Sequence, residues 1–148
     1  MEILYNLAKT AKLYELKLQP VMQKYDLLKI EIDVLMFLYN NPQFDKASDI
    51  VKIRGIAKSH VSKAIDLLYK KGLVDIIQDK MDKRIHHLII LNKANQIIKE
   101  GQRCQKEFYD VFFKNMSVEE IELIKSFFHK MNENVKEELK CMHSSFMQ

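Results

Sequence analysis

Short polar and basic side chains are concentrated in the first turns of one predicted helix. They are Lys58, Ser59, His60, Ser62 and Lys63. Hydroxyl, imidazole and ammonium groups can donate hydrogen bonds to phosphate oxygens and to the edges of bases. The two lysines suit phosphates as well as bases, whereas the serines and the histidine are the better candidates for base edges. On composition alone these residues equally form an ordinary solvated helix face, but they also have the chemistry to bind a nucleic acid.

These side chains need a frame, and residues 50–73 predict one. The apolar residues behind them recur at spacings of four and three, as one buried face of a helix requires; they are Val61, Ile65 and Leu68. Gly55 can adopt the positive φ of a tight turn before this helix, and Gly72 follows two lysines as a glycine cap would. The segment is thus predicted to be a helix-turn-helix, whose second helix enters the major groove of DNA in known examples.

The first helix of this motif is expected to begin at Ala47 or at the next residue. Ile50 and Ile53 lie three positions apart, so we expect them to share its inner face. Lys52 and Arg54 are candidates for contacts with the DNA backbone.

A charged hairpin is predicted directly after the motif. Leu73–Gln78 and Ile85–Leu91 are rich in aliphatic and β-branched residues, as strands are, and Asp79–Arg84 is a charged turn between them. His86 and His87 are neighbours on a strand and must point to opposite faces. A helix-turn-helix followed by such a hairpin is a winged helix.

The segment from Gly55 to the charged turn, with the aliphatic strand and long helix that follow, resembles the MarR family of bacterial transcriptional regulators. The most specific match is the run of Asp82, Lys83 and Arg84, which corresponds to the Asp-x-Arg wing of that family. The resemblance implies that Arg84 enters the minor groove, that Asp82 helps to hold it, and that Lys83 belongs to the same DNA-binding surface. The threonine and glycine usual at the next junction are absent, and we expect Asn92 to cap the following helix instead.

The resemblance further implies a homodimer that binds double-stranded DNA at a near-palindromic operator, expected as a repressor, with activation as the alternative. Release by a small aromatic effector is also implied. Its pocket would draw on Tyr14, Leu18, Met36, Tyr39, Phe108 and Phe112, residue types that equally well form ordinary core.

Long helices are predicted at both ends of the chain. The first carries an apolar stripe up to Tyr25, and Pro20 is expected to bend or break it. Ser117 and Glu120 have the spacing of a capping box at the start of the last helix. These helices are too long for one small domain to bury. We therefore expect a mainly α fold, with a winged helix-turn-helix domain over residues 29–92 and a dimerisation region over residues 1–28 and 93–148.

Between these parts, Ile30–Tyr39 is apolar nearly all round and is predicted to be a buried central helix. Residues 40–42 should end it, and Phe44–Lys46 is a candidate for a very short strand that pairs with the wing.

Composition sets the remaining limits. The 148 residues carry a net charge of +4 with a pI of about 8.9, which permits a polyanionic partner. No apolar run reaches the length of a membrane span, and the N-terminus lacks a secretion signal, so we expect a cytoplasmic protein. No phosphate-binding loop, nucleophile elbow or cofactor motif is present, so we expect neither an enzyme nor a bound cofactor.

Three alternatives stay open. An architectural dimer would bind DNA without sequence preference. A metal sensor would need a cluster of ligands, but the spacing of the five histidines does not form one. A redox sensor would use Cys104 or Cys141, both of which lie among apolar residues.

Overall fold

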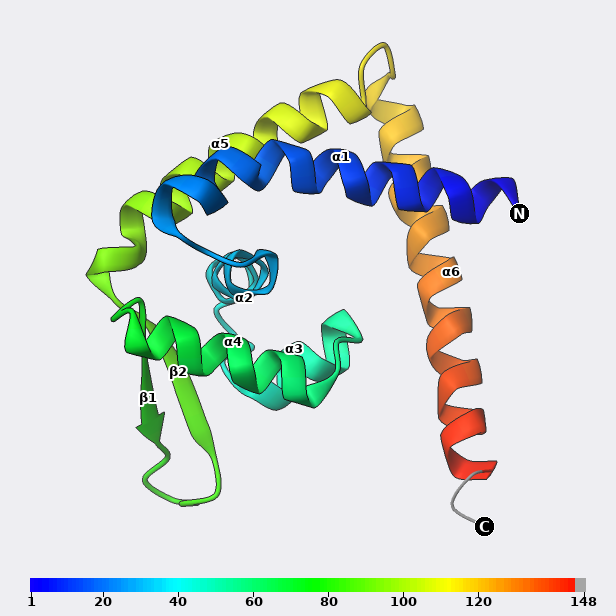
Figure 1. The fold of residues 1–148 in the computed structure, drawn as a ribbon. Coiled ribbons are helices and arrows are strands. Elements are labelled where there is room, and N and C mark those ends of the chain that lie inside the picture. Colours follow the sequence, from blue (N-terminus) through cyan, green and yellow to red (C-terminus); the bar gives the residue numbers. More distant parts are fainter. Residues whose placement is uncertain (146–148) are drawn as a thin grey trace. The chain divides into compact units, whose positions relative to one another are not determined.

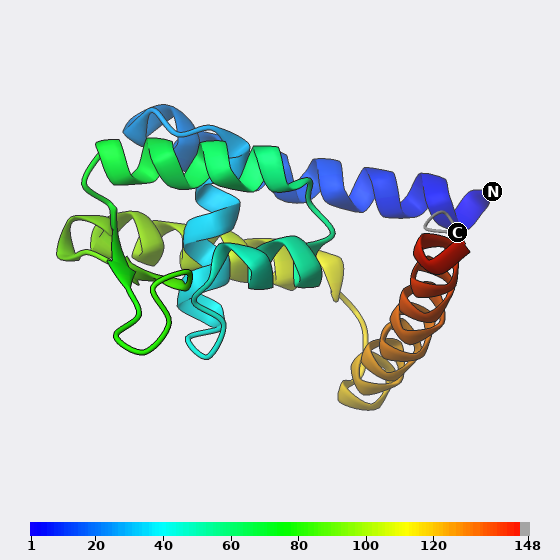
Figure 2. The ribbon, with the colours of Figure 1, turned by 90° about the horizontal axis from the view of Figure 1, so that it is seen from below.

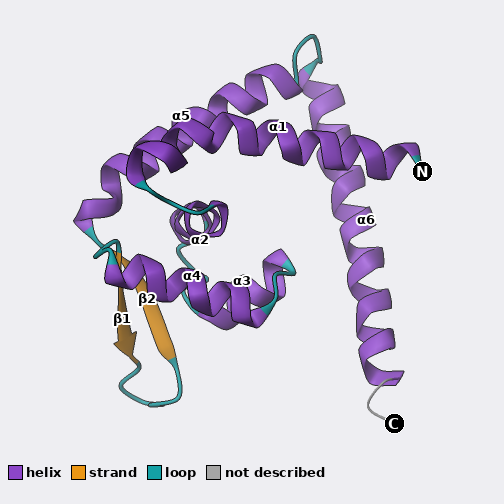
Figure 3. Ribbon diagram, in the orientation of Figure 1, coloured by secondary structure: helices purple, strands orange, loops and turns teal. Residues whose placement is uncertain are grey.

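The computed structural model describes residues 1–145, with side chains described up to Met142 (Figure 1). In chain order the elements are α1 (Glu2–Tyr25), α2 (Lys29–Asn40), α3 (Ala47–Arg54), α4 (Lys58–Lys70), β1 (Val74–Gln78), β2 (His86–Ile90), the short 3-10 helix η1 (Asn92–Ala94), α5 (Asn95–Phe112) and α6 (Val118–Ser145). The described chain is mainly helical, with one two-stranded sheet (Figure 3). It divides into two compact units, Met1–Phe108 and the residues from Tyr109 onward. None of the described helices is long and apolar enough to span a membrane.

Helix α2 is the centre of the first unit. Its residues from Ile32 to Leu38 are all buried, which confirms the predicted central helix. Figure 1 views α2 along its axis, with α1 and α5 on one side of it and α3 and α4 on the other, and Figure 2 shows it crossing between them. The helix ends where the backbone N–H and side-chain amide of Asn41 both donate to Phe37 O, at 2.9 Å each.

Helix α1 is continuous from Glu2 to Tyr25, so Pro20 does not break it. Only the C-terminal part of its predicted stripe is buried: Leu18 and Val21 are inside the core, whereas Ile3 is 67% exposed. The last turn closes through Asp26, which takes a left-handed conformation with φ of 51°. The first turns of α1 therefore carry apolar side chains that the first unit leaves uncovered.

The helix-turn-helix forms as predicted, with one correction. Gly55 joins α3 to α4 at φ 62°, and Gly72 follows α4 at φ 69°, with Leu73 N–H donating to Leu68 O at 2.9 Å. This bond and the left-handed glycine are the signature of a Schellman cap. The expectation that Ile50 and Ile53 share the inner face is wrong: Ile50 is buried but Ile53 is 45% exposed, because Val51 packs against the core in its place.

The hairpin also forms as predicted. Strands β1 and β2 are antiparallel, and the register places Ile77 opposite His87. The expected short strand at Phe44–Lys46 is absent from the described sheet. The segment nevertheless lies beside the wing, since Leu88 N–H donates to Asp45 O at 2.7 Å. One such bond is too few to extend the sheet.

Two predictions concern the entries to the C-terminal helices. Asn92 does not act as an N-cap: it is the first residue of η1, and Leu91 precedes it without a side-chain cap. The capping box of α6 is confirmed, because Ser117 N–H donates to Glu120 Oε2 at 2.7 Å and Glu120 N–H donates to Ser117 Oγ at 3.2 Å. Within the described residues of the second unit, the apolar stripe of α6 lies open, with Val135 56% exposed.

Candidate nucleic-acid interface

The start of α4 presents the predicted polar surface to solvent. Lys58, Ser59, His60, Ser62 and Lys63 are all exposed, while Val61, Ala64 and Ile65 are buried beneath them. Within the described chain, neither Lys58 nor Lys63 has a hydrogen bond or ion pair, and no side chain caps the first turn. Uncapped amides and the positive end of the helix dipole favour anions such as phosphate. Residues 58–63 thus offer free donors on one face of a rigid helix.

Lys52 and Arg54 lie on α3, also exposed. The Arg54 guanidinium lies 4.0 Å from Asp33 Oδ2, and Lys29 contacts the same carboxylate. Arg54 is therefore partly held by α2. Lys52 is the better placed of the two for the predicted contact with the DNA backbone.

The wing carries an arginine that is exposed and yet oriented. Arg84 Nε and Nη2 donate to the two carboxylate oxygens of Asp82, both at 3.1 Å, and Arg84 N–H donates to Asp82 Oδ1 at 3.0 Å. This contact lowers the pKa of Asp82 below its usual range, chiefly through the guanidinium. The Arg84 side chain is 90% exposed, so Asp82 fixes its direction without covering it. Three of its five N–H groups stay available for a ligand.

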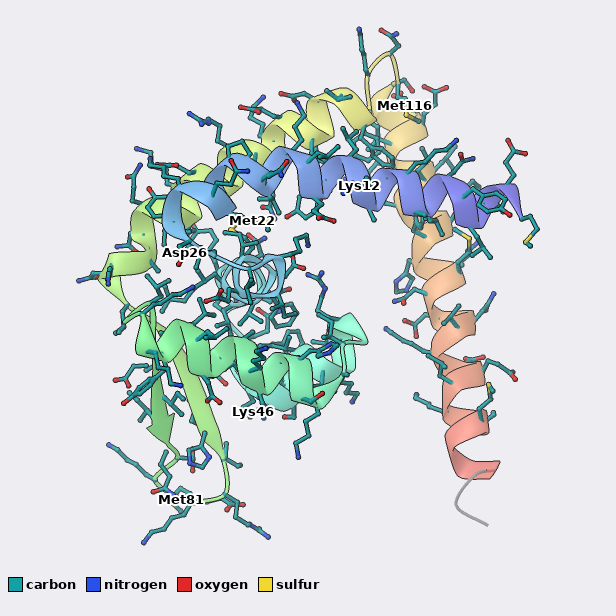
Figure 4. All side chains as sticks on the ribbon, viewed as in Figure 1. Lys12, Met22, Asp26, Lys46, Met81 and Met116 are labelled. Carbon is teal, nitrogen blue, oxygen red and sulfur yellow. The ribbon has the colours of Figure 1, made fainter. Side chains whose placement is uncertain are left out.

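Hydrogen bonds within the wing loop hold its shape. Asp79 Oδ1 accepts from Met81 N–H at 2.7 Å and from Asp82 N–H at 2.9 Å. The Gln78 side chain donates to Lys83 O at 2.6 Å across the loop. Met81, which is 95% exposed, lies at the tip of the hairpin (Figure 4).

The sequence reasoning missed a contact at the base of the wing. His87 Nδ1 lies 2.9 Å from Asp45 Oδ2, and its Nε2 lies 3.0 Å from Asp79 Oδ2. Alternation on the strand predicted that His86 and His87 face opposite ways, and His86 is indeed the more exposed of the two. This alternation did not predict the contact with Asp45, which is 42 residues distant in the chain.

A second missed contact fixes the far end of α4. Lys71 Nζ donates to Glu31 Oε1 at 2.8 Å, to Glu31 Oε2 at 3.0 Å and to Asp26 O at 2.6 Å. The Glu31 carboxylate is fully buried and also accepts from Leu28 N–H at 2.8 Å. One ammonium thus joins the end of α1, the start of α2 and the end of α4, and so sets the orientation of the helix that carries residues 58–63.

The residues of the expected effector pocket are brought together only in part. Leu18, Met36 and Phe108 are buried, and the ring of Tyr14 packs edge-on against Phe108 with centroids 5.3 Å apart. The Gln105 amide donates to the Tyr14 hydroxyl at 2.9 Å. Tyr39, at the end of α2, is 46% exposed, and Phe112 belongs to the second unit.

The possible metal ligands of the described chain and the two cysteines lie where metal or redox sensing finds little support. Among the described residues, no group of three or more His, Cys, Asp and Glu side chains could hold a metal ion. Cys104 is buried, and burial raises the pKa of its thiol, which disfavours the reactive thiolate. Cys141 is exposed on α6, contrary to the expectation that both thiols lie among apolar neighbours.

Known proteins are similar to this chain in sequence pattern and in fold. The sequence model of the MarR family matches residues 25–85. No curated protein sequence matches the chain. Among solved structures, a protein of Listeria monocytogenes described as a MarR-family transcriptional regulator, in complex with 26-mer DNA, is similar with a TM-score of 0.83 and 24% identity, over 91% of this chain and 89% of that one.

Two further structures extend the comparison. MepR of S. aureus, in complex with DNA, has a TM-score of 0.75 and 18% identity over 91% of this chain and 96% of its own. BpsR of Bordetella bronchiseptica, whose DNA binding is regulated by 6-hydroxynicotinic acid, has a TM-score of 0.70 and 18% identity over 89% of this chain and 99% of its own.

The similarity to the MarR family therefore has two independent supports. The sequence pattern of the family covers α2, the helix-turn-helix and most of the wing, and the fold is similar to that of a MarR-family structure over 91% of the chain. Members of this family are transcriptional regulators rather than enzymes, as the sequence led us to expect. Residues 25–85, which carry the helix-turn-helix, thus match the MarR family of transcriptional regulators, and the winged-helix fold of the chain is that of MarR structures.

Proposed function

We propose that this protein is a repressor that binds a near-palindromic operator as a homodimer in the cytoplasm. Residues 58–63 of each copy enter the major groove, and Arg84 enters the adjacent minor groove. The observation that carries the proposal is that exposed donors at the start of α4 and an exposed, oriented arginine on the wing belong to one rigid frame. The DNA complexes of similar proteins support the same use of the fold.

DNase footprinting on the promoter region of the protein's own gene tests this function. We expect two protected half-sites with centres about 34–36 Å apart, because a two-fold symmetric dimer places its recognition helices one helical turn apart. A scrambled fragment of equal length is the control. Equal protection of both fragments would instead support the architectural alternative.

Exposed apolar surface supports the dimer. The described part of α6 leaves a row of apolar side chains open to solvent, and they are Phe128, Met131, Val135, Leu139 and Met142. Beside it an open groove of about 550 Å³ is lined by Phe112, Phe113, Ile124, Lys125, Phe128, His129 and Asn132. Patches of this kind mark interaction surfaces in soluble proteins. We propose that residues 1–28 and 93–148 form the dimerisation region around a DNA-binding domain of residues 29–92; sedimentation as a monomer at operator-binding concentrations would contradict this.

Lys63→Ala is expected to weaken binding to every DNA sequence by a similar factor. Lys63 is exposed on α4 and suited to a phosphate, so its loss should also reduce the slope of log affinity against log salt by about 1. Fluorescence anisotropy titrations at several salt concentrations measure both quantities. Ser62→Ala is the control, since a neutral side chain leaves the slope unchanged. A loss confined to the operator would assign Lys63 to a base instead.

Release by a small aromatic effector is a further part of the proposal. The regulation of BpsR by 6-hydroxynicotinic acid supports an aromatic acid as the class of ligand. The candidate pocket combines the buried Leu18, Met36 and Phe108 with the hydroxyl of Tyr14. A ligand could bind more tightly to a dimer conformation whose recognition helices do not match the spacing of the operator half-sites. It would then shift the population toward that conformation and weaken DNA binding. Operator affinity that stays constant through a benzoate titration would count against this class.

A further inference from the structure

The contacts of His87 connect two separate elements of the first unit. Asp45 lies in the segment between α2 and α3, and Asp79 is the first residue of the wing loop after β1. The imidazole of His87 lies between them, with one ring nitrogen 2.9 Å from Asp45 Oδ2 and the other 3.0 Å from Asp79 Oδ2. Together with the bond from Leu88 N–H to Asp45 O, the ring fastens the wing to the chain that leads into the helix-turn-helix.

Both ring nitrogens must donate for both contacts to be favourable. A neutral imidazole has only one N–H, and its other nitrogen is a lone pair that a carboxylate oxygen repels. The observed arrangement is therefore that of the imidazolium. The two carboxylates accordingly raise the pKa of His87 above its ordinary value of 6.5, Asp45 most strongly.

The contact with Asp79 leads directly to Arg84. The other oxygen of Asp79 accepts from the backbone N–H groups of Met81 and Asp82, and the Asp82 carboxylate holds the guanidinium of Arg84. The backbone N–H of Asp82, followed by the His87 ring and the backbone N–H of Met81, lowers the pKa of Asp79 to about 2. Asp79 is thus ionised wherever His87 titrates, and a change at His87 acts on the residue that shapes the loop.

We propose that His87 is a positioning residue that, in its protonated form, ties the wing to the segment before α3 and so places Arg84 for the minor groove. The proposal rests on the proposed function, and it adds that operator affinity falls as the imidazolium is lost. The tie is complete below about pH 6.5 and weakens as the pH rises through the higher pKa of the folded protein.

The other charged groups near the wing do not replace Asp45 and Asp79. Asp75 lies on the same face of the sheet, but it is paired with Ile89, and the residue opposite His87 is the apolar Ile77. Asp82 is engaged by Arg84. The charges that face the ring from the elements packed against it are therefore those of Asp45 and Asp79.

Operator affinity at two pH values tests the proposal. The full-length protein, His87→Gln and His86→Gln are titrated with the operator at about pH 6 and about pH 8, at constant ionic strength. Glutamine has one amide nitrogen and no titration in this range, so it cannot donate on both sides. Between about pH 6 and about pH 8, we expect the operator affinity of the unchanged protein and of His86→Gln to fall by a similar factor. The factor for His87→Gln should be about threefold smaller. All three proteins share every residue outside positions 86 and 87, so pH effects that arise elsewhere cancel from the comparison.

A measurement without DNA separates failure of this inference from failure of the proposed function. The wing amides of Met81 and Arg84 are followed by NMR as the pH is raised, and we expect them to shift together with the His87 ring. Asp45→Asn, which keeps the histidine, should move this transition to lower pH; this variant also serves if His87→Gln fails to fold. Amides that titrate independently of His87, or equal pH dependence of all three affinities, would overturn the inference. If the wing amides titrate with His87 but the protein binds no operator at either pH, the contact between His87 and the wing is supported and its role in DNA binding is refuted.

Discussion

Lys71→Met is expected to lower the free energy of unfolding by about 3 kcal/mol, the largest stability effect that we predict for a single side chain. The substitution leaves the fully buried Glu31 carboxylate without its cation. It also removes the bond to Asp26 O that joins the end of α1 to the end of α4. Urea unfolding followed by circular dichroism measures the change, with all proteins at one concentration because dimer formation shifts apparent stability.

Two further variants make this result specific. Lys70→Met changes the exposed neighbour and should alter stability by no more than about 0.5 kcal/mol. Combining Lys71→Met with Glu31→Gln removes the buried charge as well, and it should recover more than half of the loss. A destabilisation that is equal for Lys70→Met and Lys71→Met would show that the buried pair is not its source.

Arg84→Ala is expected to weaken operator binding by more than about tenfold, or at least about 1.4 kcal/mol. The reason is that Asp82 already holds the exposed guanidinium in one direction, so little ordering is needed when it meets the groove. Fluorescence anisotropy with a labelled operator measures the affinity. Circular dichroism should be unchanged, because an exposed side chain contributes little to the core.

Matched variants separate direction from charge. Arg84→Lys keeps the charge but has no planar fork for Asp82, so we expect it to recover only a minor part of the loss. Asp82→Ala frees the guanidinium and should give an intermediate affinity. Lys80→Ala, on the same loop, should have the smaller and sequence-independent effect of a phosphate contact. An Arg84→Ala protein that binds as tightly as the parent would remove the wing arginine from the interface.

Local chemistry explains why the frame of the site could be predicted. Gly55 and Gly72 mark the ends of α3 and α4 because both adopt a positive φ. The aliphatic runs on either side of Asp79–Arg84 predicted the hairpin, and the Asp82–Arg84 contact spans only two residues. Information of this kind lies within a few neighbouring positions, where sequence patterns are most reliable.

The features that the sequence did not predict depend instead on tertiary packing. Spacing alone placed Ile53 inside, but whether α3 buries Ile53 or Val51 depends on how it rests on the core. Glu31 and Lys71 are 40 residues apart, and Asp45 and His87 are 42 apart. Such pairs are formed by tertiary packing, and neither partner differs in sequence from an ordinary surface charge.

The internal bonding of the wing loop has a consequence for the kinetics of recognition. Asp79, Gln78 and Asp82 hold the loop and its arginine in one conformation in the free protein. A segment that is already folded loses little conformational entropy on contact, so association need not wait for a rare shape of the hairpin. Discrimination between operator sequences should then reside in how long each complex survives rather than in how quickly it forms.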